Sequence, residues 1–386
     1  MRMVPTNCIK EGSYLAHDLT GKDGRTLLKK GVQLNEGLIK RIEDNSIYTV
    51  YINDEYSNNE IEDILKPQLR DTAVKSIKET FGHFEQYSSY LKEHNKSLVN
   101  KQIVKKREKY VESINNISKD IVEEILHNKN VMINLVDIKS IDNYTYQHAV
   151  NVAVLSLVIG MELRLNKNEL YELCIGAMLH DLGKAFISKD ILFKKTTLDE
   201  AEFEVIKTHT TKGYEYISQQ YELPVSAKLI ALQHHERLDG SGYPSGYKNV
   251  DIHKLAKIVA IADVYDAMTS DTPYRKAVPP HEAIELIMGS AGRLFDFEMA
   301  KIFVRKIVPY PVGSLIKLSN GDVGVVQETR INYPLRPKVK IIRQSAVSII
   351  IKEIDLMVET NLVIEGLQYE VPNVSVPHYL QKRIDE

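Results

Sequence analysis

The spacing of apolar side chains divides the chain of 386 residues into three parts with different textures. In the first part, short apolar runs alternate with turns. Gly21 and Gly24 separate one apolar run from the next, which begins at Thr26, and this pattern predicts a β-hairpin. A helix over 34–42 and a strand over 47–52 complete the expected elements. The pattern therefore predicts a small α+β unit at the start of the chain.

The pattern becomes helical beyond residue 61. Up to about residue 130 it is also highly charged, and the basic run 101–109 is typical of a solvated helix face or a linker rather than a nucleic-acid site. Over 111–308, apolar residues recur every three or four positions, as they do at Val111, Ile114, Ile117, Ile121, Ile125, Leu170, Leu173, Cys174, Ala177 and Met178. So many helical segments predict a bundle whose facing side chains can build a site.

The texture changes again after residue 308. A strand over 315–318, an Asn-Gly turn and a strand over 323–327 predict a hairpin, and further β-like runs follow at 339–342 and 347–351. We therefore predict a mainly α fold, with an all-α bundle flanked by a small α+β unit and a small β domain. The predicted domains are 1–60 (α+β), 61–110 (a charged helical connector), 111–308 (the catalytic bundle) and 309–386 (β).

Composition narrows the class of protein. With 50 basic and 52 acidic residues, the formal net charge is −2, which gives no support to binding of duplex nucleic acid. The two cysteines, Cys8 and Cys174, cannot build a disulfide framework or a cysteine zinc site, and Cys174 is expected to be a small buried hydrophobe. No signal-peptide core or membrane-length apolar run is visible, so we expect a cytoplasmic protein without membrane insertion.

Histidines gather in the helical part of the chain. Five of the twelve lie where they could converge, at His148, His180, His209, His234 and His235. Neighbouring residues on a helix diverge by about 100°, so His180 and Asp181 can reach one metal ion only near a helix end. Gly183 is a candidate C-terminal residue for that helix. A lone His-Asp pair is weak as a signal, and it needs support from elsewhere in the chain.

That support comes from two further anomalies. Asp263 lies in an almost wholly apolar stretch, where a carboxylate must be paired, protonated or bound to a cation. Two adjacent histidines, His234 and His235, precede a glycine-rich loop, which core packing alone does not explain. A set of imidazoles and carboxylates without thiolates suits a site that holds more than one first-row transition metal ion. Two metals about 3.5–4 Å apart can share a bridging hydroxide and clamp a phosphodiester, and Lys184 would add positive charge for the phosphate.

Together these residues resemble the HD-GYP family, the bacterial subgroup of HD-superfamily phosphohydrolases. Six blocks occur in the family's order over 111–308, which is roughly half of the chain: Tyr144 to His148, His180 to Lys184, Ile191 with Leu192 and Lys194, His209 with Gly213, His234 to Pro244, and Asp263 to Ser270. The full Gly242-Tyr243-Pro244 loop makes the resemblance specific. It implies a helical bundle that encloses a metal centre and hydrolyses cyclic di-GMP to linear pGpG, to GMP or to both.

The resemblance also implies roles for individual residues. Metal ligands fall on His148, His180, Asp181, His209, His234, His235 and Asp263. Asp181 would bridge two divalent ions, with iron or manganese expected, and Asp181 and Lys184 would be the catalytic residues. Lys184 would contact the scissile phosphate, and Gly242 and Tyr243 would shape the guanine nucleotide pocket. A regulatory or dimerising role is predicted for residues 1–60, so a homodimer is one expected assembly.

The chain departs from the family pattern at two positions. Tyr144 stands where members with a third metal carry a glutamate, which predicts two metals. Thr272 stands where an arginine is frequent, which leaves Arg275 as the predicted substrate contact and Lys276 as a weaker one. Two alternatives stay open: a cyclic-dinucleotide receptor of low activity, and an HD hydrolase acting on another nucleotide such as 3',3'-cGAMP.

Overall fold

The protein is described by a computed structural model. It describes residues 1–20, 26–45, 47, 49–54, 57, 64–93, 101–127, 144–194, 196–219, 222–270, 277–330, 332–344 and 349–370. Within these ranges no helix is both long enough and apolar enough to cross a bilayer. The predicted mainly α fold with small flanking β units is confirmed.

The N-terminal unit is a small antiparallel sheet with one helix beside it. Its elements are β1 (Arg2–Pro5), η1 (Thr6–Cys8), β2 (Tyr14–Leu15), β3 (Leu19–Thr20), β4 (Thr26–Leu28), α1 (Glu36–Asp44) and β5 (Thr49–Asn53). β5 lies between β1 and β2, and β3 pairs with β4 as the predicted hairpin. The Asn35 side chain caps α1 by accepting from the Leu38 N–H. Val4, Leu15 and Ile52 form the centre of its own apolar core.

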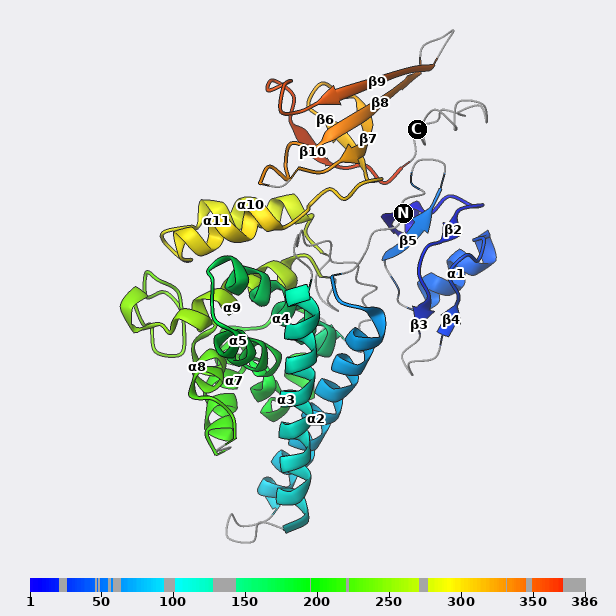
Figure 1. Cartoon of the computed structure of the whole chain (residues 1–386). Helices are drawn as coiled ribbons and strands as arrows, with labels where there is room; N and C mark the ends of the chain where they lie inside the picture. The colour runs from blue at the N-terminus through cyan, green and yellow to red at the C-terminus, as the bar shows by residue number, and fades with distance from the viewer. Residues whose placement is uncertain are drawn as a thin grey trace.

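A pair of long helices follows. α2 (Pro67–Glu93) and α3 (Lys101–His127) pack side by side and extend downward from the bundle in Figure 1. The backbone of the basic run 101–109 is helical, while the side chains of 101–107 lie outside the described residues. α3 continues without a break through residue 110, where the connector was predicted to end. The division of the chain into four domains stays a prediction.

The bundle is built around α4 (Tyr144–Glu162), which is buried continuously from His148 to Gly160. Around it lie α5 (Lys167–Leu179), η3 (Leu182–Phe186), α6 (Lys189–Leu192), α7 (Glu200–Ser218), α8 (Val225–Gln233), η4 (Asn249–Asp251), α9 (Lys254–Met268), α10 (Pro280–Gly289) and α11 (Phe297–Lys306). α2 and α3 contribute to the same apolar core. Cys174 is fully buried there, as predicted, and burial raises the pKa of its thiol to about 12.

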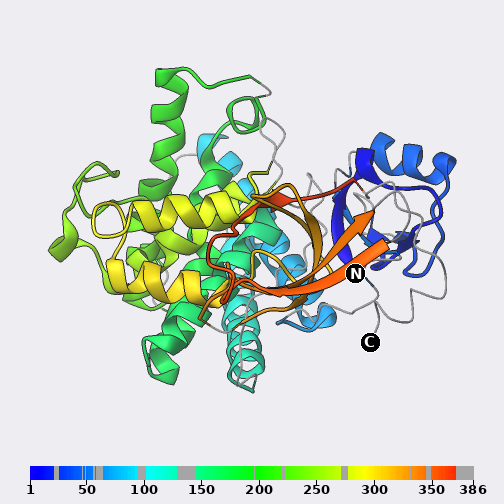
Figure 2. The same cartoon turned by 90° about the horizontal axis from the view of Figure 1, so that it is seen from above.

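The C-terminal unit is a single antiparallel sheet in the strand order β10-β6-β7-β8-β9. Its strands are β6 (Leu315–Leu318), β7 (Val323–Glu328), β8 (Lys338–Gln344), β9 (Ile349–Asp355) and β10 (Ile364–Leu367), and the sequence pattern did not indicate β10. This sheet packs around its own core, which includes Ile316, Val326 and Val339. It lies above α10 and α11 in Figure 1, and in Figure 2 the antiparallel pair of β8 and β9 extends toward the N-terminal unit.

Candidate metal centre

Seven ligand-type side chains converge inside the bundle from five helices. His148 comes from α4, His180 from the C-cap of α5, Asp181 from the residue after it, His209 from α7, His234 and His235 from the end of α8, and Asp263 from α9. All are buried except His235, which is half-buried. The seven residues fall into two groups, each with ligand atoms within 4.8 Å of one another. The first group is His148, His180 and Asp263, and the second group is Asp181, His209, His234 and His235.

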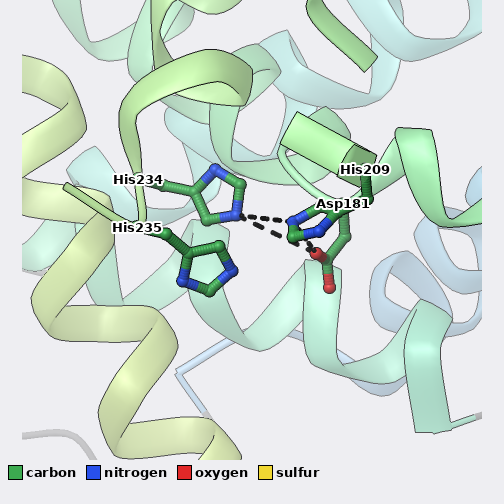
Figure 3. Close-up of side chains that lie close together, drawn as sticks. All are labelled: Asp181, His209, His234 and His235. Atoms are coloured by element: carbon green, nitrogen blue, oxygen red, sulfur yellow. Dashed lines mark hydrogen bonds and ion pairs between the residues drawn. The ribbon is translucent and has the colours of Figure 1, made fainter. Parts of the chain in front are cut away.

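Asp181 belongs to the second group and also faces the first group. Its Oδ2 is 3.4 Å from Nε2 of His180 and 3.7 Å from Nε2 of His148. Its Oδ1 is 3.4 Å from Nε2 of His209 and 3.9 Å from Nε2 of His234. Figure 3 shows this second group, with Asp181 and His209 facing the paired histidines. Each carboxylate oxygen therefore faces one group, which is the arrangement a bridging ligand requires.

Asp263 also faces both groups. Its Oδ1 lies 3.1 Å from Nε2 of His148 and 3.8 Å from Nε2 of His180, while its Oδ2 lies 3.8 Å from Nδ1 of His235. The sequence argument required a partner for a carboxylate in this apolar helix, and the structure supplies three histidines. The two aspartates thus enclose the space between the ligand groups.

The histidines are oriented by hydrogen bonds on their far nitrogens. Nδ1 of His180 donates to the Ala177 carbonyl at 2.6 Å, and Nδ1 of His209 donates to the Ile206 carbonyl at 2.7 Å. His234 uses the Ile230 carbonyl at 3.0 Å in the same way. A carbonyl oxygen can only accept, so each Nδ1 must carry the proton and each Nε2 presents a lone pair to the centre.

Burial keeps most of these imidazoles neutral. It lowers the pKa of His209 to about 4 and lowers the pKa values of His234 and His235 further from their usual range. His148 differs, because the hydrogen bonds that it donates to the carboxylates of Asp263 and Asp266 outweigh burial and raise its pKa to about 9. Burial alone would raise the pKa of Asp181, yet Lys184 and His180 hold it well below its ordinary value.

The donor set fits divalent metal ions. Within the described ranges, Nε2 of His180 and Oδ1 of Asp181 are buried and accept or donate no hydrogen bond, although both point into the cluster. Leaving such atoms without a partner is costly, and a bound cation would remove that cost. Imidazole nitrogen and carboxylate oxygen without sulfur suit first-row transition metals. The residues present therefore fit a site for divalent metal ions.

Gly183 brings two ligand-bearing segments together. A Cβ at this position would lie 1.8 Å from the His209 carbonyl oxygen and 2.7 Å from the Gly213 nitrogen, so only glycine lets η3 approach α7 this closely. We expected Gly183 to end the helix, but α5 stops at Leu179 and the chain passes directly into η3. Its role is close approach, which places Asp181 beside His209.

Lys184 reaches Asp181 from η3. Its Nζ lies 2.5 Å from Oδ2 of Asp181, and about a third of its side chain is exposed. The ammonium group is therefore held at the edge of the ligand cluster by a side chain that is partly exposed.

The Gly-Tyr-Pro loop lies against the second ligand group. The ring of Tyr243 stacks on His235, with centroids 4.6 Å apart, and burial raises the pKa of its hydroxyl. A Cβ on Gly242 would lie 2.4 Å from the Arg237 nitrogen, so this position also excludes a side chain. Buried Glu236 holds the loop by accepting from the Ser245 N–H at 2.8 Å and the Tyr247 N–H at 3.0 Å.

The structure leaves some predicted residues undescribed and shows others that the sequence did not predict. Arg275, Thr272 and Lys276 lie outside the described residues. Tyr144, where a third-metal glutamate would stand, stacks its ring on His148 with centroids 5.5 Å apart. Sequence reasoning missed Glu236, and it missed the buried polar residues behind His148, which are Asp266, Asn151 and Arg70. A second aspartate three residues after Asp263 in an apolar helix was an available signal.

Comparisons with known proteins give family matches in two parts of the chain. Residues 121–299 match the HD domain family, and residues 315–367 match the KOW domain associated with HD domain. The chain is 36% identical over 226 residues to cyclic di-GMP phosphodiesterase PA4108 of Pseudomonas aeruginosa, covering 58% of this chain and 54% of that protein. It is 36% identical over 220 residues to a cyclic di-GMP phosphodiesterase of Thermotoga maritima, covering 56% of each.

The chain is also similar to a curated relative with another named substrate and to a solved structure. The chain is 36% identical over 191 residues to 3'3'-cGAMP-specific phosphodiesterase 1 of Vibrio cholerae, covering 49% of this chain and 43% of that protein. The solved structure of Bd1817, an HDG"Y"P protein from Bdellovibrio bacteriovorus, overlaps with a TM-score of 0.46 at 16% identity, over 78% of this chain and 98% of that one. The chain spans about half the length of the curated relatives it matches.

Residues 121–299 of this chain therefore form an HD domain, and the resemblance predicted from the motif order is confirmed. HD-domain phosphohydrolases use divalent metal ions, and the cluster of histidines and aspartates offers this chain's ligands for them.

Proposed function

We propose that the chain is a metal-dependent phosphodiesterase that hydrolyses cyclic di-GMP to linear pGpG, to GMP or to both. The observation that carries this proposal is Asp181, whose two oxygens face two separate groups of histidines while Lys184 stands beside it. Two ligand groups joined by one carboxylate are the arrangement that two-metal phosphodiesterases need. The names of the similar curated proteins support the substrate.

We assign the metal ligands as the seven residues predicted from sequence, holding two ions with iron or manganese favoured. When bound, such ions supply Lewis acidity at the phosphate and lower the pKa of water. Lys184 contacts a phosphate oxygen and stabilises charge that develops there, because its partly exposed side chain ends beside Asp181. Asp181 binds in both halves of the centre and so fixes their relative position.

The guanine base is proposed to bind at the Gly-Tyr-Pro loop. Tyr243 presents an aromatic ring beside the second ligand group, and Phe203 of α7 lies next to it with centroids 6.5 Å apart. Nζ of Lys207 lies over both rings, 4.9 Å from that of Phe203 and 5.6 Å from that of Tyr243. An aromatic surface with a cation beside it suits a purine attached to a phosphate. Arg275 stays a predicted contact.

A second candidate substrate is 3',3'-cGAMP. A relative named as specific for that dinucleotide has the same 36% identity to this chain as one relative named for cyclic di-GMP, over 191 rather than 226 residues. Thr272 supports the same alternative, because it removes one arginine expected near the substrate. A receptor of low activity is the remaining alternative. A cytoplasmic location and dimerisation through residues 1–60 stay predictions.

The test is turnover by protein of defined metal content. Protein purified anaerobically and loaded separately with Fe(II) and Mn(II) would be given each dinucleotide, and the products would be separated by chromatography. We expect linear dinucleotide or GMP from cyclic di-GMP, and no product after chelation. Faster cleavage of 3',3'-cGAMP would reassign the substrate. Bound metal without product from either would favour the receptor.

The first variant is Asp181→Asn, which keeps the shape but removes the bridging charge. Removing a residue that hydrogen-bonds to a metal ligand lowers metal affinity or activity by about 10–100-fold. Loss of a shared ligand should therefore lower kcat by more than about 100-fold. Asp120→Asn, at an exposed aspartate on α3, is the matched control and should retain full activity. Wild-type turnover by Asp181→Asn in metal-defined buffer would contradict the assignment of Asp181.

A further inference from the structure

A buried arginine lies behind the metal centre, on a helix outside the HD domain match. Arg70 is in the first turn of α2, which begins at Pro67, and its side chain is only 8% exposed. Arginine is almost never this buried without partners. α2 packs against α4 and η3, the two elements that flank ligands of the first and second groups.

Arg70 is joined to a metal ligand by a continuous series of hydrogen bonds. Its Nη1 donates to Oδ1 of Asn151 at 2.6 Å. Nδ2 of Asn151 donates to Oδ1 of Asp266 at 3.0 Å, and Oδ2 of Asp266 lies 2.7 Å from Nδ1 of His148. Asn151 and Asp266 are both fully buried.

The chemistry of the groups fixes the direction of every bond in this series. A guanidinium can only donate, so Asn151 must present its oxygen to Arg70 and its amide N–H to Asp266. The Asp266 carboxylate can only accept, so Nδ1 of His148 carries a proton. Nε2 of His148 is thereby turned toward Asp263 and Asp181, at 3.1 and 3.7 Å.

We propose that Arg70 is a positioning residue for His148, acting through Asn151 and Asp266. The inference rests on the proposed metal centre, because it gives Arg70 a role only if His148 binds an ion. His180, His209 and His234 are each oriented by a backbone carbonyl close by in sequence. His148 instead depends on side chains, and the last of these belongs to the helix that leads in from the N-terminal unit.

A purely structural role is the competing explanation. In that case Arg70 serves only to neutralise the buried carboxylate of Asp266, and its loss lowers stability without a selective effect on metal. The two explanations differ in one respect. Positioning predicts that the ion held by His148, His180 and Asp263 is weakened, while the ion held by Asp181, His209, His234 and His235 is retained.

The experiment compares Mn(II) binding by the wild-type chain and by Arg70→Met, which keeps the length of the side chain and removes its donors. Equilibrium dialysis with metal analysis would resolve two binding steps. We expect one step to weaken by about 10–100-fold in Arg70→Met and the other to stay within about twofold. Lys75→Met removes an exposed cation from the same helix and should leave both steps unchanged.

Two further variants separate positioning from folding. Arg70→Lys can still donate one hydrogen bond to Asn151, so we expect metal binding closer to that of the wild type than to that of Arg70→Met. Asn151→Ala breaks the series at its second member. Because both residues act through one series, Arg70→Met should add little to the loss in Asn151→Ala. If Arg70→Met does not fold, Arg70→Lys and Asn151→Ala alone carry the test, because Asn151→Ala should by itself weaken the same single binding step.

The outcomes distinguish this inference from the function on which it rests. Wild-type protein that binds no metal would remove both together. Wild-type protein that binds two ions but cleaves no dinucleotide would remove the proposed substrate and leave the role of Arg70 intact. Two unchanged binding steps in folded Arg70→Met, or equal weakening of both, would overturn the role of Arg70 alone.

Discussion

At the scale of single residues, the orientation of each candidate histidine ligand depends on the group that accepts a hydrogen bond from its second ring nitrogen. Three of the histidines donate Nδ1 to a carbonyl three or four residues earlier in the chain, so the helix itself fixes the tautomer. For His180 this carbonyl, on Ala177, belongs to the last turn of α5, where helix carbonyls have no intrahelical partner. One contact therefore satisfies a helix end and orients a ligand.

Gly183 gives a prediction at the same scale. Gly183→Ala forces η3 away from α7, because the added Cβ would lie 1.8 Å from the His209 carbonyl oxygen. Forced overpacking costs about 1–3 kcal/mol or more, so we expect a loss of at least about 2 kcal/mol in the free energy of unfolding and weaker metal binding. Urea titration and metal analysis would measure the two effects.

Gly82→Ala is the matched control for that variant. Gly82 lies inside α2 with open space where its Cβ would be, so alanine should be neutral or should stabilise the protein by about 0.5–1 kcal/mol. Equal effects of the two substitutions would show that close approach at Gly183 is unimportant.

At the scale of elements, sequence indicated which helix ends carry the candidate ligands, but it did not indicate the path of the loops between them. Adjacent ligands required a helix end, and α5 and α8 do end at His180 and His234. The apolar helix around Asp263 was visible from composition. The sequence did not reveal that the chain continues from Asp181 into η3, because that path depends on contact with α7, an element that begins at residue 200.

Glu236 carries the element-scale prediction. Glu236→Gln replaces one of two carboxylate acceptors by an amide group that cannot accept from the loop N–H groups at Ser245 and Tyr247. An unsatisfied buried N–H costs about 1–3 kcal/mol, so the Gly-Tyr-Pro loop should loosen. We expect KM for cyclic di-GMP to rise by about 10-fold with metal content unchanged.

Steady-state kinetics on metal-loaded protein would check this prediction. Glu215→Gln, at an exposed position on α7, is the control and should leave KM unchanged. An unaltered KM in Glu236→Gln would mean that the loop does not hold the substrate. Loss of metal instead would place the role of Glu236 at the ligands.

At the scale of the whole molecule, the described residues form separate apolar cores, and the core of the helical bundle encloses the candidate site. Periodicity could predict that these regions differ, since helical and β patterns are distinct. It could not predict the contact between Arg70 and Asn151, which lie 81 residues apart, because a buried arginine in a charged segment resembles any other cation of a solvated helix. Such contacts follow from tertiary packing, which no local pattern encodes.

Metal binding should therefore stabilise the bundle and leave the C-terminal sheet unaffected. The proposed ligands come from α4, α5, α7, α8 and α9, whereas the described core of β6, β7 and β8 contains none of them. An ion at 100 times its Kd adds about 2.7 kcal/mol to any opening that releases it, which corresponds to about 100-fold slower exchange. Hydrogen exchange followed by mass spectrometry, with and without Mn(II), should show slowing in those helices alone. Asp181→Asn should show no slowing, and equal slowing in the sheet would mean that the cores unfold as one unit.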